Sequence, residues 1–360
     1  ILSADKEFNI EKVFNNFIFE KSSIYFNLTF LSESFITNLL AFFSNKNGTV
    51  FYNIDLIGNL ARTGNWFTNL KDDHILLDKV IEQNPHENIL SVDGTLFQNS
   101  GANITQQLAY CLAQANEYLN HFKESNNKQL KLTFKLSVGS NYFFEIAKIR
   151  ALRRLYALLA NEYGSFPECN ILTVPSNRNK TIYDYNTNML RSTTENMSAI
   201  LGGANTVCNY SYDYIFHKSN EFGERIARNQ LLILKKESYF EASNNPAKGS
   251  YYIETLTEQL SEKALILFKD IEANGGFLSQ LKEGIVQRKI KESAQKEQAL
   301  FDSGELELLG TNVHQNKNDK MKDDMELFPF LKTNTRKTLL EPILEKRLSE
   351  KNEQERLKTE

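Results

Sequence analysis

Cysteine is scarce in this sequence of 360 residues. Its three cysteines, Cys111, Cys169 and Cys208, are widely spaced and form no C-x-x-C pair. An odd number of isolated thiols is typical of a reducing compartment, and it argues against both a disulfide framework and a thiolate metal site. We therefore expect free thiols, no bound metal and a cytoplasmic location.

Long apolar runs are also lacking. The longest uncharged run, Gly94 to Asn116, is interrupted by the amide side chains of Gln98, Asn99, Asn103, Gln106, Gln107 and Gln114. A membrane helix needs about 20 consecutive, mostly apolar residues, so the sequence predicts a soluble protein without membrane association. The sequence opens at Ile1 with neither a methionine nor a signal peptide, and we expect that it has been cut from a longer chain.

Neither sign of charge is in excess. The 42 Lys and Arg residues oppose 45 Asp and Glu residues, which leaves a net charge of −3. The basic surplus that nucleic-acid partners require is therefore missing. Apolar residues make up 41% of the chain, an ordinary globular value that excludes disorder. At ~150 residues per domain the length suggests two domains, but one α/β barrel with appendages fits equally well.

Local catalytic signatures are missing as well. The five histidines form neither an H-x-x-x-H nor an H-E-x-x-H pattern, so the helical spacing of zinc ligands is not found. The sequence contains no phosphate-binding G-x-x-x-x-G-K-[ST] loop and no G-x-S-x-G nucleophile elbow. Asp72, Asp73 and His74 place carboxylates beside an imidazole, but in a polar segment without a second motif. The residues alone give no support for a hydrolase or an NTPase.

What is present is an alternation of strand-like runs with helical patterns. β-Branched and aromatic residues predict strands over residues 23–30, 49–55, 88–94, 132–139, 170–175 and 204–210. Apolar residues at helical spacing lie between them, over 35–43, 104–119, 143–159 and 191–200. Strands separated by helices pair in parallel, which favours a closed (β/α) barrel or a doubly wound sheet. A barrel needs eight strands, so either some lie upstream of Ile1 or the pattern hides them.

After Glu221 the pattern becomes wholly helical. Helices are predicted over 222–239 and 256–274, the second ending at Gly275 and Gly276, which supply a left-handed cap. We expect residues 221–305 to pack as helices on a barrel formed by residues 1–220. Residues 306–360 are expected to form a linker, with its polar stretch at 310–324, and an amphipathic tail helix. The tail helix is predicted from the apolar repeat of Leu339, Leu340, Ile343, Leu344 and Leu348, and it is either solvated or lies on a partner subunit.

Several longer strings are specific to one family. Residues 136–155 (LSVGSNYFFEIAKIRALRRL) resemble the A-K-x-R-A-x-R-x-L strand and helix of the methylmalonyl-CoA mutase family. Further similarities follow in the family's order, at 188–206 (NMLRSTTENMSAILGGANT), 224–230 (ERIARNQ) and 246–257 (PAKGSYYIETLT). Asn245 stands where the family usually has aspartate. Five ordered similarities, counting 274–276, cover roughly residues 50 to 300, and they are far more specific together than any one alone.

The resemblance implies a (β/α)8 TIM-type barrel through which acyl-CoA threads. In the family, adenosylcobalamin lies across the open end of the barrel and is bound by a separate flavodoxin-like domain with a D-x-H-x-x-G ligand motif. Asp72, Asp73 and His74 are followed by Ile-Leu-Leu, without glycine at the required offset. The resemblance therefore implies that this chain binds no cofactor itself and that adenosylcobalamin belongs to the holoenzyme.

The barrel also departs from the family's catalytic pattern. In active members a strand end reads S-G-Y-H-x-x-E-A-G-A, and the similar run here, residues 93–102, has Leu96 at the histidine position. Leucine has no proton to donate to a thioester oxygen, so we assign no catalytic residue. Arg62 falls where the family has arginine, and Arg62 and Gln98 would bind substrate if the barrel were active. Tyr52, where active barrels have glutamine, would place a phenol inside the barrel.

These departures are similar to those of a known branch of the family. In that branch a catalytic large subunit pairs with a homologous small subunit that has lost activity. The sequence thus resembles a noncatalytic small subunit, in a short form without the cobalamin domain. The holoenzyme would interconvert methylmalonyl-CoA and succinyl-CoA, and the partner would be the large subunit of a heterodimer. The alternative is an acyl-CoA mutase barrel that becomes active when a separate cobalamin-binding protein is supplied.

Overall fold

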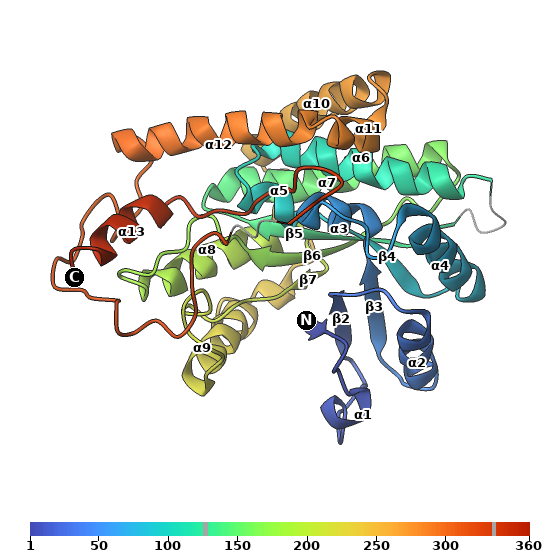
Figure 1. Cartoon of the computed structure of the whole chain (residues 1–360), viewed down its shortest axis with the longest axis horizontal. Helices are drawn as coiled ribbons and strands as arrows, with labels where there is room; N and C mark the ends of the chain where they lie inside the picture. The colour runs from blue at the N-terminus through green and yellow to red at the C-terminus, as the bar shows by residue number, and fades with distance from the viewer. Residues whose placement is uncertain (125–128, 333–335) are drawn as a thin grey trace.

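Seven parallel strands form one sheet in the computed structural model, which describes residues 1–124, 129–332 and 336–360. The strands are β1 (Leu2–Ala4), β2 (Ser23–Leu28), β3 (Thr49–Ile54), β4 (Asn88–Asp93), β5 (Leu132–Val138), β6 (Asn170–Pro175) and β7 (Thr206–Val207). Each strand pairs in parallel with the next, so the order in the sheet follows the order in the chain (Figure 1). This order is that of a TIM-type barrel, and the predicted fold class is confirmed.

The sheet is curled, so that side chains of its second and seventh strands meet across the interior. The Tyr25 hydroxyl on β2 lies 2.9 Å from Oγ1 of Thr206 on β7. All six predicted strands are present, and β1 is the one that the sequence did not indicate. Its three residues are too few to show an alternation of apolar and polar side chains.

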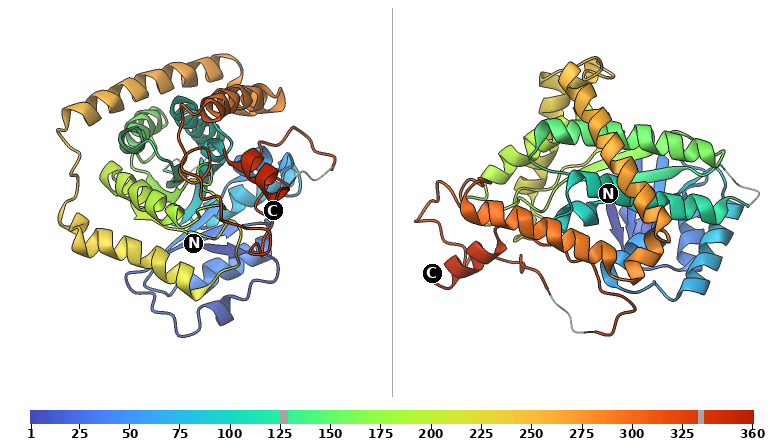
Figure 2. Two further views of the ribbon diagram at one scale, coloured as in Figure 1. Left: turned by 90° about the vertical axis from the view of Figure 1, so that its left-hand side faces the viewer. Right: turned by 90° about the horizontal axis from the view of Figure 1, so that it is seen from above.

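Helices follow the strands and cover the outside of the sheet (Figures 1 and 2). They are α1 (Ile10–Val13), α2 (Glu33–Phe43), α3 (Leu56–Thr63), α4 (Leu70–Gln83), α5 (Thr95–Asn99), α6 (Ile104–Phe122), α7 (Tyr142–Glu162) and α8 (Thr187–Gly202). A capping box between Asn103 and Gln106 starts α6, and Gly203 ends α8 with a left-handed φ of 84°. In the described residues, no helix is long and apolar enough to cross a membrane.

The C-terminal half adds a second layer of helices. These are α9 (Glu221–Leu232), the π-helix η1 (Ile233–Glu237), the 3₁₀ helix η2 (Phe240–Ala242), α10 (Tyr251–Ala273), α11 (Gly276–Lys282), α12 (Ile285–Ser303) and α13 (Glu350–Leu357). Helix α10 packs on α6 and α7, and α11 packs on α6. The predicted end of α10 is confirmed, because Asn274 caps it and Gly275 follows with a φ of 97°.

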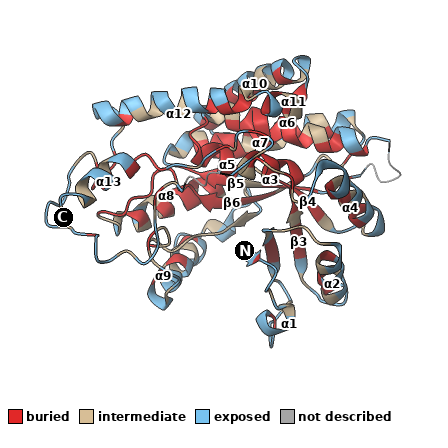
Figure 3. Ribbon diagram, in the orientation of Figure 1, coloured by how far each residue is buried: buried red, intermediate tan, exposed pale blue. Residues whose placement is uncertain are grey.

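The two faces of the sheet carry different side chains. Ile24 and Phe26 on β2 belong to the main core between sheet and helices, whereas Tyr25 points to the inside of the curl. The buried residues concentrate in the strands and in α5 to α7, and the exposed residues lie at the periphery (Figure 3). On β3, Tyr52 packs in the main core and Phe51 in the interior, so the prediction of a phenol inside the barrel at Tyr52 was wrong. Strands buried on both faces lack a clean alternation, which makes the inward face hard to read from sequence.

The tail differs from the prediction. Residues 336–347, which carry most of the apolar repeat, have no helical structure, and the only helix of the described tail is α13, Glu350–Leu357. Pro342 stands within the repeat. Proline removes one backbone donor and disfavours helical backbone in the preceding residue, so the repeat cannot form a continuous helix.

Candidate functional site

Aromatic rings fill the inside of the curled sheet. The rings of Tyr25 and Phe51 stack with their centroids 4.2 Å apart and an interplanar angle of 1°. Leu172 on β6 completes this buried cluster, and Cys208 packs against it. The Tyr25 hydroxyl bonds to Thr206 as described above, which ties the rings to the opposite side of the interior. Side chains of β2, β3 and β6 therefore meet inside the curl at this level.

A cavity of about 610 Å³ lies at the carboxyl ends of the strands. We call it the mouth cavity. Its lining includes strand-end and loop residues from every part of the barrel, among them Asn53, Asp55, Arg62, Asp93, Thr95, Asn99, Lys135, Val174, Asn177, Tyr210, Tyr214 and Glu345. Active sites of TIM-type barrels lie at this end, so the mouth cavity is the candidate functional site.

Asp93, at the end of β4, is the centre of an ion cluster. Its Oδ2 lies 3.1 Å from Nη2 of Arg62 and 3.5 Å from Nζ of Lys135. Thr95 donates its backbone N–H to Oδ1 at 3.1 Å and also donates its hydroxyl. Burial alone would raise the pKa of Asp93, but the charges of Lys135 and Arg62 and the Thr95 hydrogen bonds lower it to about 2. Asp93 is therefore ionised, and it holds both cations at the mouth cavity.

Asp55 is a second carboxylate at the mouth cavity, and its environment has the opposite effect. Its Oδ1 accepts hydrogen bonds from Gln114 at 2.6 Å, from Tyr118 at 2.7 Å and from the Gly58 N–H at 2.8 Å. The last of these caps the start of α3. Burial raises the pKa of Asp55 to about 6, against the lowering effect of the hydrogen bonds from Tyr118 and from the Asp93 and Gly58 N–H groups. Asp55 thus fixes the junction of β3, α3 and α6.

A segment of the tail crosses the mouth cavity. We call residues 338–349 the strap. Backbone N–H groups of the strap donate to Gly64, Ala61, Asn99 and Arg178: Leu339 to the Gly64 carbonyl at 2.9 Å, Ile343 to Ala61 at 2.8 Å, Lys346 to Asn99 at 3.0 Å and Leu348 to Arg178 at 2.9 Å. In Figure 1 the strap, drawn in red, passes over α3 and α5. From its middle, Glu345 forms an ion pair with Arg62 and accepts a hydrogen bond from Asn99.

The two predicted substrate-binding residues lie at different cavities. Arg62 lines the mouth cavity, whereas Gln98 lines a second cavity of about 800 Å³ beside α6 and α7. There Gln98 accepts a hydrogen bond from Nζ of the buried Lys148 at 2.8 Å and donates to Glu145 at 3.2 Å. Lys148 and Glu145 form a buried ion pair at 2.5 Å. Gln98 is thus part of a buried polar network outside the mouth cavity.

Leu96 is 1% exposed and belongs to the main core. Its neighbours in α5, Thr95 and Asn99, line the mouth cavity instead. None of the five histidines, which all lie in the described residues, is among the lining residues. His74 donates a hydrogen bond from Nδ1 to the Leu70 carbonyl at 2.8 Å, and its ring packs against Trp66 and His121.

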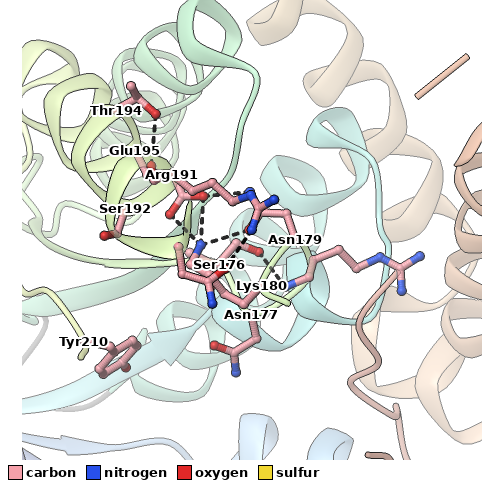
Figure 4. A network of polar contacts seen from close by, with 12 residues as sticks. Ser176, Asn177, Asn179, Lys180, Arg191, Ser192, Thr194, Glu195 and Tyr210 are labelled. Atoms are coloured by element: carbon pink, nitrogen blue, oxygen red, sulfur yellow. Dashed lines mark hydrogen bonds and ion pairs between the residues drawn. The ribbon is translucent and has the colours of Figure 1, made fainter. Parts of the chain in front are cut away.

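Two buried ion pairs hold the loop after β6 and the tail together. Lys180 lies 2.8 Å from Oε2 of Glu195 on α8, and Asn179 also donates to Glu195, as Figure 4 shows. Burial lowers the pKa of Lys180, against the opposing effect of Glu195. In the tail, Arg347 pairs with Glu353 at 2.6 Å and donates to the Lys180 carbonyl at 3.0 Å. The second pair anchors the end of the strap on the barrel.

Sequence reasoning found Arg62 but missed Asp55, Asp93, Lys135 and Glu345. Asp93 lies at the end of a predicted strand, where parallel sheets collect functional side chains, so its position was an available signal. Lys135 lies in the middle of β5, where it is the one charged residue of the strand. Glu345 had no comparable signal, because it lies 283 positions from Arg62 in the chain.

Comparison with known proteins agrees with the sequence strings. Residues 42–359 match the family described as methylmalonyl-CoA mutase. The chain is 36% identical over 242 residues to the methylmalonyl-CoA mutase small subunit of Porphyromonas gingivalis, which covers 64% of this chain and 39% of that protein. It is 33% identical over 238 residues to the methylmalonyl-CoA mutase large subunit of Propionibacterium freudenreichii subsp. shermanii, covering 64% and 33%.

A third relative is a methylmalonyl-CoA mutase of Cereibacter sphaeroides, 32% identical over 247 residues that cover 66% of this chain and 35% of the relative. Matched segments thus span 33% to 39% of the length of these three relatives. The similarity therefore leaves most of each relative unmatched.

Proposed function

Because the chain belongs to the methylmalonyl-CoA mutase family, we propose that it is a noncatalytic small subunit that pairs with a homologous catalytic large subunit. The family as a whole depends on adenosylcobalamin, which supplies radical isomerisation chemistry when bound. On this proposal the large subunit carries that chemistry, and this chain provides a folded partner surface.

The aromatic cluster inside the curl is the observation that carries the proposal, because it supports a filled barrel axis. The sequence resemblance implies that acyl-CoA threads along the axis in active barrels. Here the Tyr25 and Phe51 rings stack on the inner face of β2 and β3, and Leu172 packs against them. An extended pantetheine chain would have to displace rings that are 2% and 7% exposed. Removing such rings from a core costs about 3–5 kcal/mol each, so this cluster of side chains does not move aside easily.

The residues at the mouth cavity do not fit the family's chemistry either. Leu96 stands at the family's histidine position and is packed in the main core. No histidine lines the mouth cavity to polarise a thioester. His74, the candidate from the Asp72-Asp73-His74 run, packs against Trp66 on the outer side of α4. We therefore derive no step through cobalamin from this chain's residues.

Co-purification tests the pairing. The chain and the large subunit are co-expressed, and the mixture is separated by size exclusion at micromolar concentration. We expect a 1:1 complex in which methylmalonyl-CoA mutase activity depends on the large subunit. The large subunit mixed with an unrelated TIM-type barrel serves as the control. A chain that elutes apart from the large subunit would refute the pairing.

The retained Arg62 and the 610 Å³ mouth cavity favour a second candidate, an acyl-CoA mutase barrel that is active with a separate cobalamin-binding protein. The isolated chain is mixed with such a protein, adenosylcobalamin and methylmalonyl-CoA. The filled axis predicts no succinyl-CoA, even with saturating reagents. Formation of succinyl-CoA above the rate without this chain would establish the second candidate and reject the noncatalytic role.

A further inference from the structure

We propose that His217 is a pH-sensitive latch. As an imidazolium it holds tail residues 324–327 on the loop between β7 and α9, residues 208–220, and as a neutral imidazole it releases them. The inference goes beyond the proposed function, because it concerns how the tail of this chain is held whether or not the chain pairs with a large subunit.

Both ring nitrogens of His217 lie against oxygen atoms that accept hydrogen bonds. Nδ1 is 3.1 Å from Oδ2 of Asp213 in the same loop, and Nε2 is 2.8 Å from the backbone carbonyl oxygen of Asp324 in the tail. The neutral imidazole carries one N–H, so it can serve only one of these two oxygens, whereas the imidazolium donates to both. The geometry therefore fits the charged form of the ring.

Asp213 supplies the buried half of the latch. It is 2% exposed, and Asn220 donates to the same Oδ2 at 2.8 Å. Among the described residues, His217 is the one cationic side chain that forms an ion pair with Asp213. A buried carboxylate that loses its cation is left with an uncompensated charge, so loss of the His217 proton weakens this end of the loop.

The tail meets the loop through backbone contacts as well. The N–H groups of Glu326 and Leu327 both donate to the Phe216 carbonyl, at 2.9 and 2.8 Å. The Lys218 N–H donates to Oε2 of Glu326 at 2.7 Å. The bond from His217 is the only one of these four contacts whose donor titrates near neutral pH, so it is the contact through which pH acts.

The titratable groups around the ring carry mostly negative charge. Asp324 places its carboxylate Oδ1 3.6 Å from Nε2. The remaining groups, from the loop, the tail and the segment before α8, are Asp213, Lys218, Glu326, Tyr185 and Tyr212. Burial raises the pKa of both tyrosines, so their phenols stay neutral near pH 7. One lysine therefore stands against three carboxylates, which favours a cation at His217.

These surroundings shift the pKa of His217 upward. Burial of the ring would lower it, but the hydrogen bonds to Asp213 and Asp324 and the charges of both carboxylates raise it above its usual 6.5. A latched ring therefore keeps a proton that a released ring loses. The latch is complete below about pH 6.5 and is lost as the pH rises through the higher pKa of the folded chain.

Release of the latch reaches the mouth cavity through the same loop. The loop carries Tyr210 and Tyr214, which line the mouth cavity, and the Tyr214 hydroxyl donates to the side-chain oxygen of Asn177. The latch thus joins the tail to one wall of the mouth cavity. We expect this wall to become more mobile above the pKa of His217.

Nitrogen NMR of the full chain, labelled with ¹⁵N-histidine, tests the charge of the ring directly. The His217 signals are identified by their absence from His217→Gln, and the pH is varied from 5 to 9. We expect protons on both ring nitrogens at pH 6 and a pKa above 6.5. A ring that lacks one of these protons at pH 6, or a pKa at or below 6.5, would overturn the proposal.

Hydrogen exchange of residues 319–330 measures the release. The rate in His217→Gln is divided by the rate in the wild type at the same pH, which cancels the pH dependence of the exchange chemistry. At pH 6 we expect about tenfold faster exchange in the variant, because a hydrogen bond to a charged group stabilises a contact by that factor or more. The ratio should fall toward one as the pH rises through the pKa of His217.

His86→Gln is the matched control, since His86 is exposed in the loop before β4, and it should exchange like the wild type at every pH. If His217→Gln does not fold, His217→Asn, whose amide can still donate to Asp213, takes its place. Equal exchange in the variant and the wild type at pH 6, or a ratio that does not change with pH, would contradict the latch. Such a result leaves the pairing test untouched, because pairing is measured by co-elution.

Discussion

Tyr25 and Phe51 lie opposite each other in the register of β2 and β3, and their rings stack in parallel inside the barrel at 4.2 Å. Paired positions on one face of a sheet are close enough for aromatic rings to touch. Both rings are buried inside the curl, where they pack with Leu172, a residue that also lines the mouth cavity. The proposed loss of activity depends on this pair more than on any other feature of the fold.

Phe51→Ala should lower the free energy of unfolding by about 3–5 kcal/mol, because it leaves a cavity among tightly packed side chains. Urea unfolding followed by circular dichroism measures the change. Phe143→Ala is the matched control, since that ring is 50% exposed, and it should cost less than half as much. Equal losses in the two variants would mean that the cluster of Tyr25, Phe51 and Leu172 is loosely packed.

Strands and helices with a strong local pattern were predictable. The run 170–175 agrees with β6 residue for residue, because β-branched residues there are bounded by turn residues. The end of α8 was also readable, since Gly203 supplies the left-handed backbone that closes a helix. Helix α4 was missed, because the run Asp72 to His74 near its start is polar and hides the apolar stripe of Leu77, Val80 and Ile81.

The candidate site was less predictable than the fold. The side that a strand turns to the interior depends on register, and strand β3 is apolar on both faces, so Tyr52 was assigned to the wrong one. The ion pair of Arg62 and Glu345 joins residues 283 positions apart. No local pattern reports such a contact, and the helical repeat around Glu345 instead suggested a tail helix that Pro342 prevents.

Asp55 should make the chain less stable as the pH rises from about 4 to 6. Burial raises the pKa of Asp55 from 3.8 to about 6, so the folded chain keeps this proton after the unfolded chain has lost it. In that range the unfolded state binds fewer protons than the folded state, and the free energy of unfolding therefore falls with rising pH. Urea unfolding at pH 4, 5, 6 and 7 measures the slope.

Asp55→Asn removes the titrating group, and the fall between pH 4 and 6 should shrink in this variant. Asp93 serves as an internal comparison, because its pKa is lowered to about 2. Its contribution is complete above about pH 4 and is lost as the pH falls toward 2, so the two effects lie in different windows. An unchanged slope in Asp55→Asn would show that other groups cause the fall.

Glu353→Ala should destabilise the chain by about 3–5 kcal/mol, because it leaves the buried Arg347 guanidinium without its partner. Glu353 also accepts hydrogen bonds from the Ile182 N–H at 3.0 Å and the Ser349 hydroxyl at 2.8 Å. Limited proteolysis should then cut the tail faster than in the wild type. Glu355→Ala, at an exposed position of the same helix, should change neither measurement.

Leu96→His should not restore mutase activity, although it returns the family's residue to its position. Leu96 is 1% exposed in the main core, so an imidazole there would be buried without a hydrogen-bond partner and would lower the free energy of unfolding by about 1–3 kcal/mol. The volume-conserving Leu96→Met should cost less than about 1.5 kcal/mol.

Both variants are compared by urea unfolding and by succinyl-CoA formation with a cobalamin-binding protein, adenosylcobalamin and methylmalonyl-CoA. A Leu96→His chain that stays as stable as Leu96→Met and forms succinyl-CoA would show that one side chain separates this barrel from an active one. The filled axis predicts the opposite, since an imidazole at residue 96 leaves Tyr25 and Phe51 in the path of the substrate.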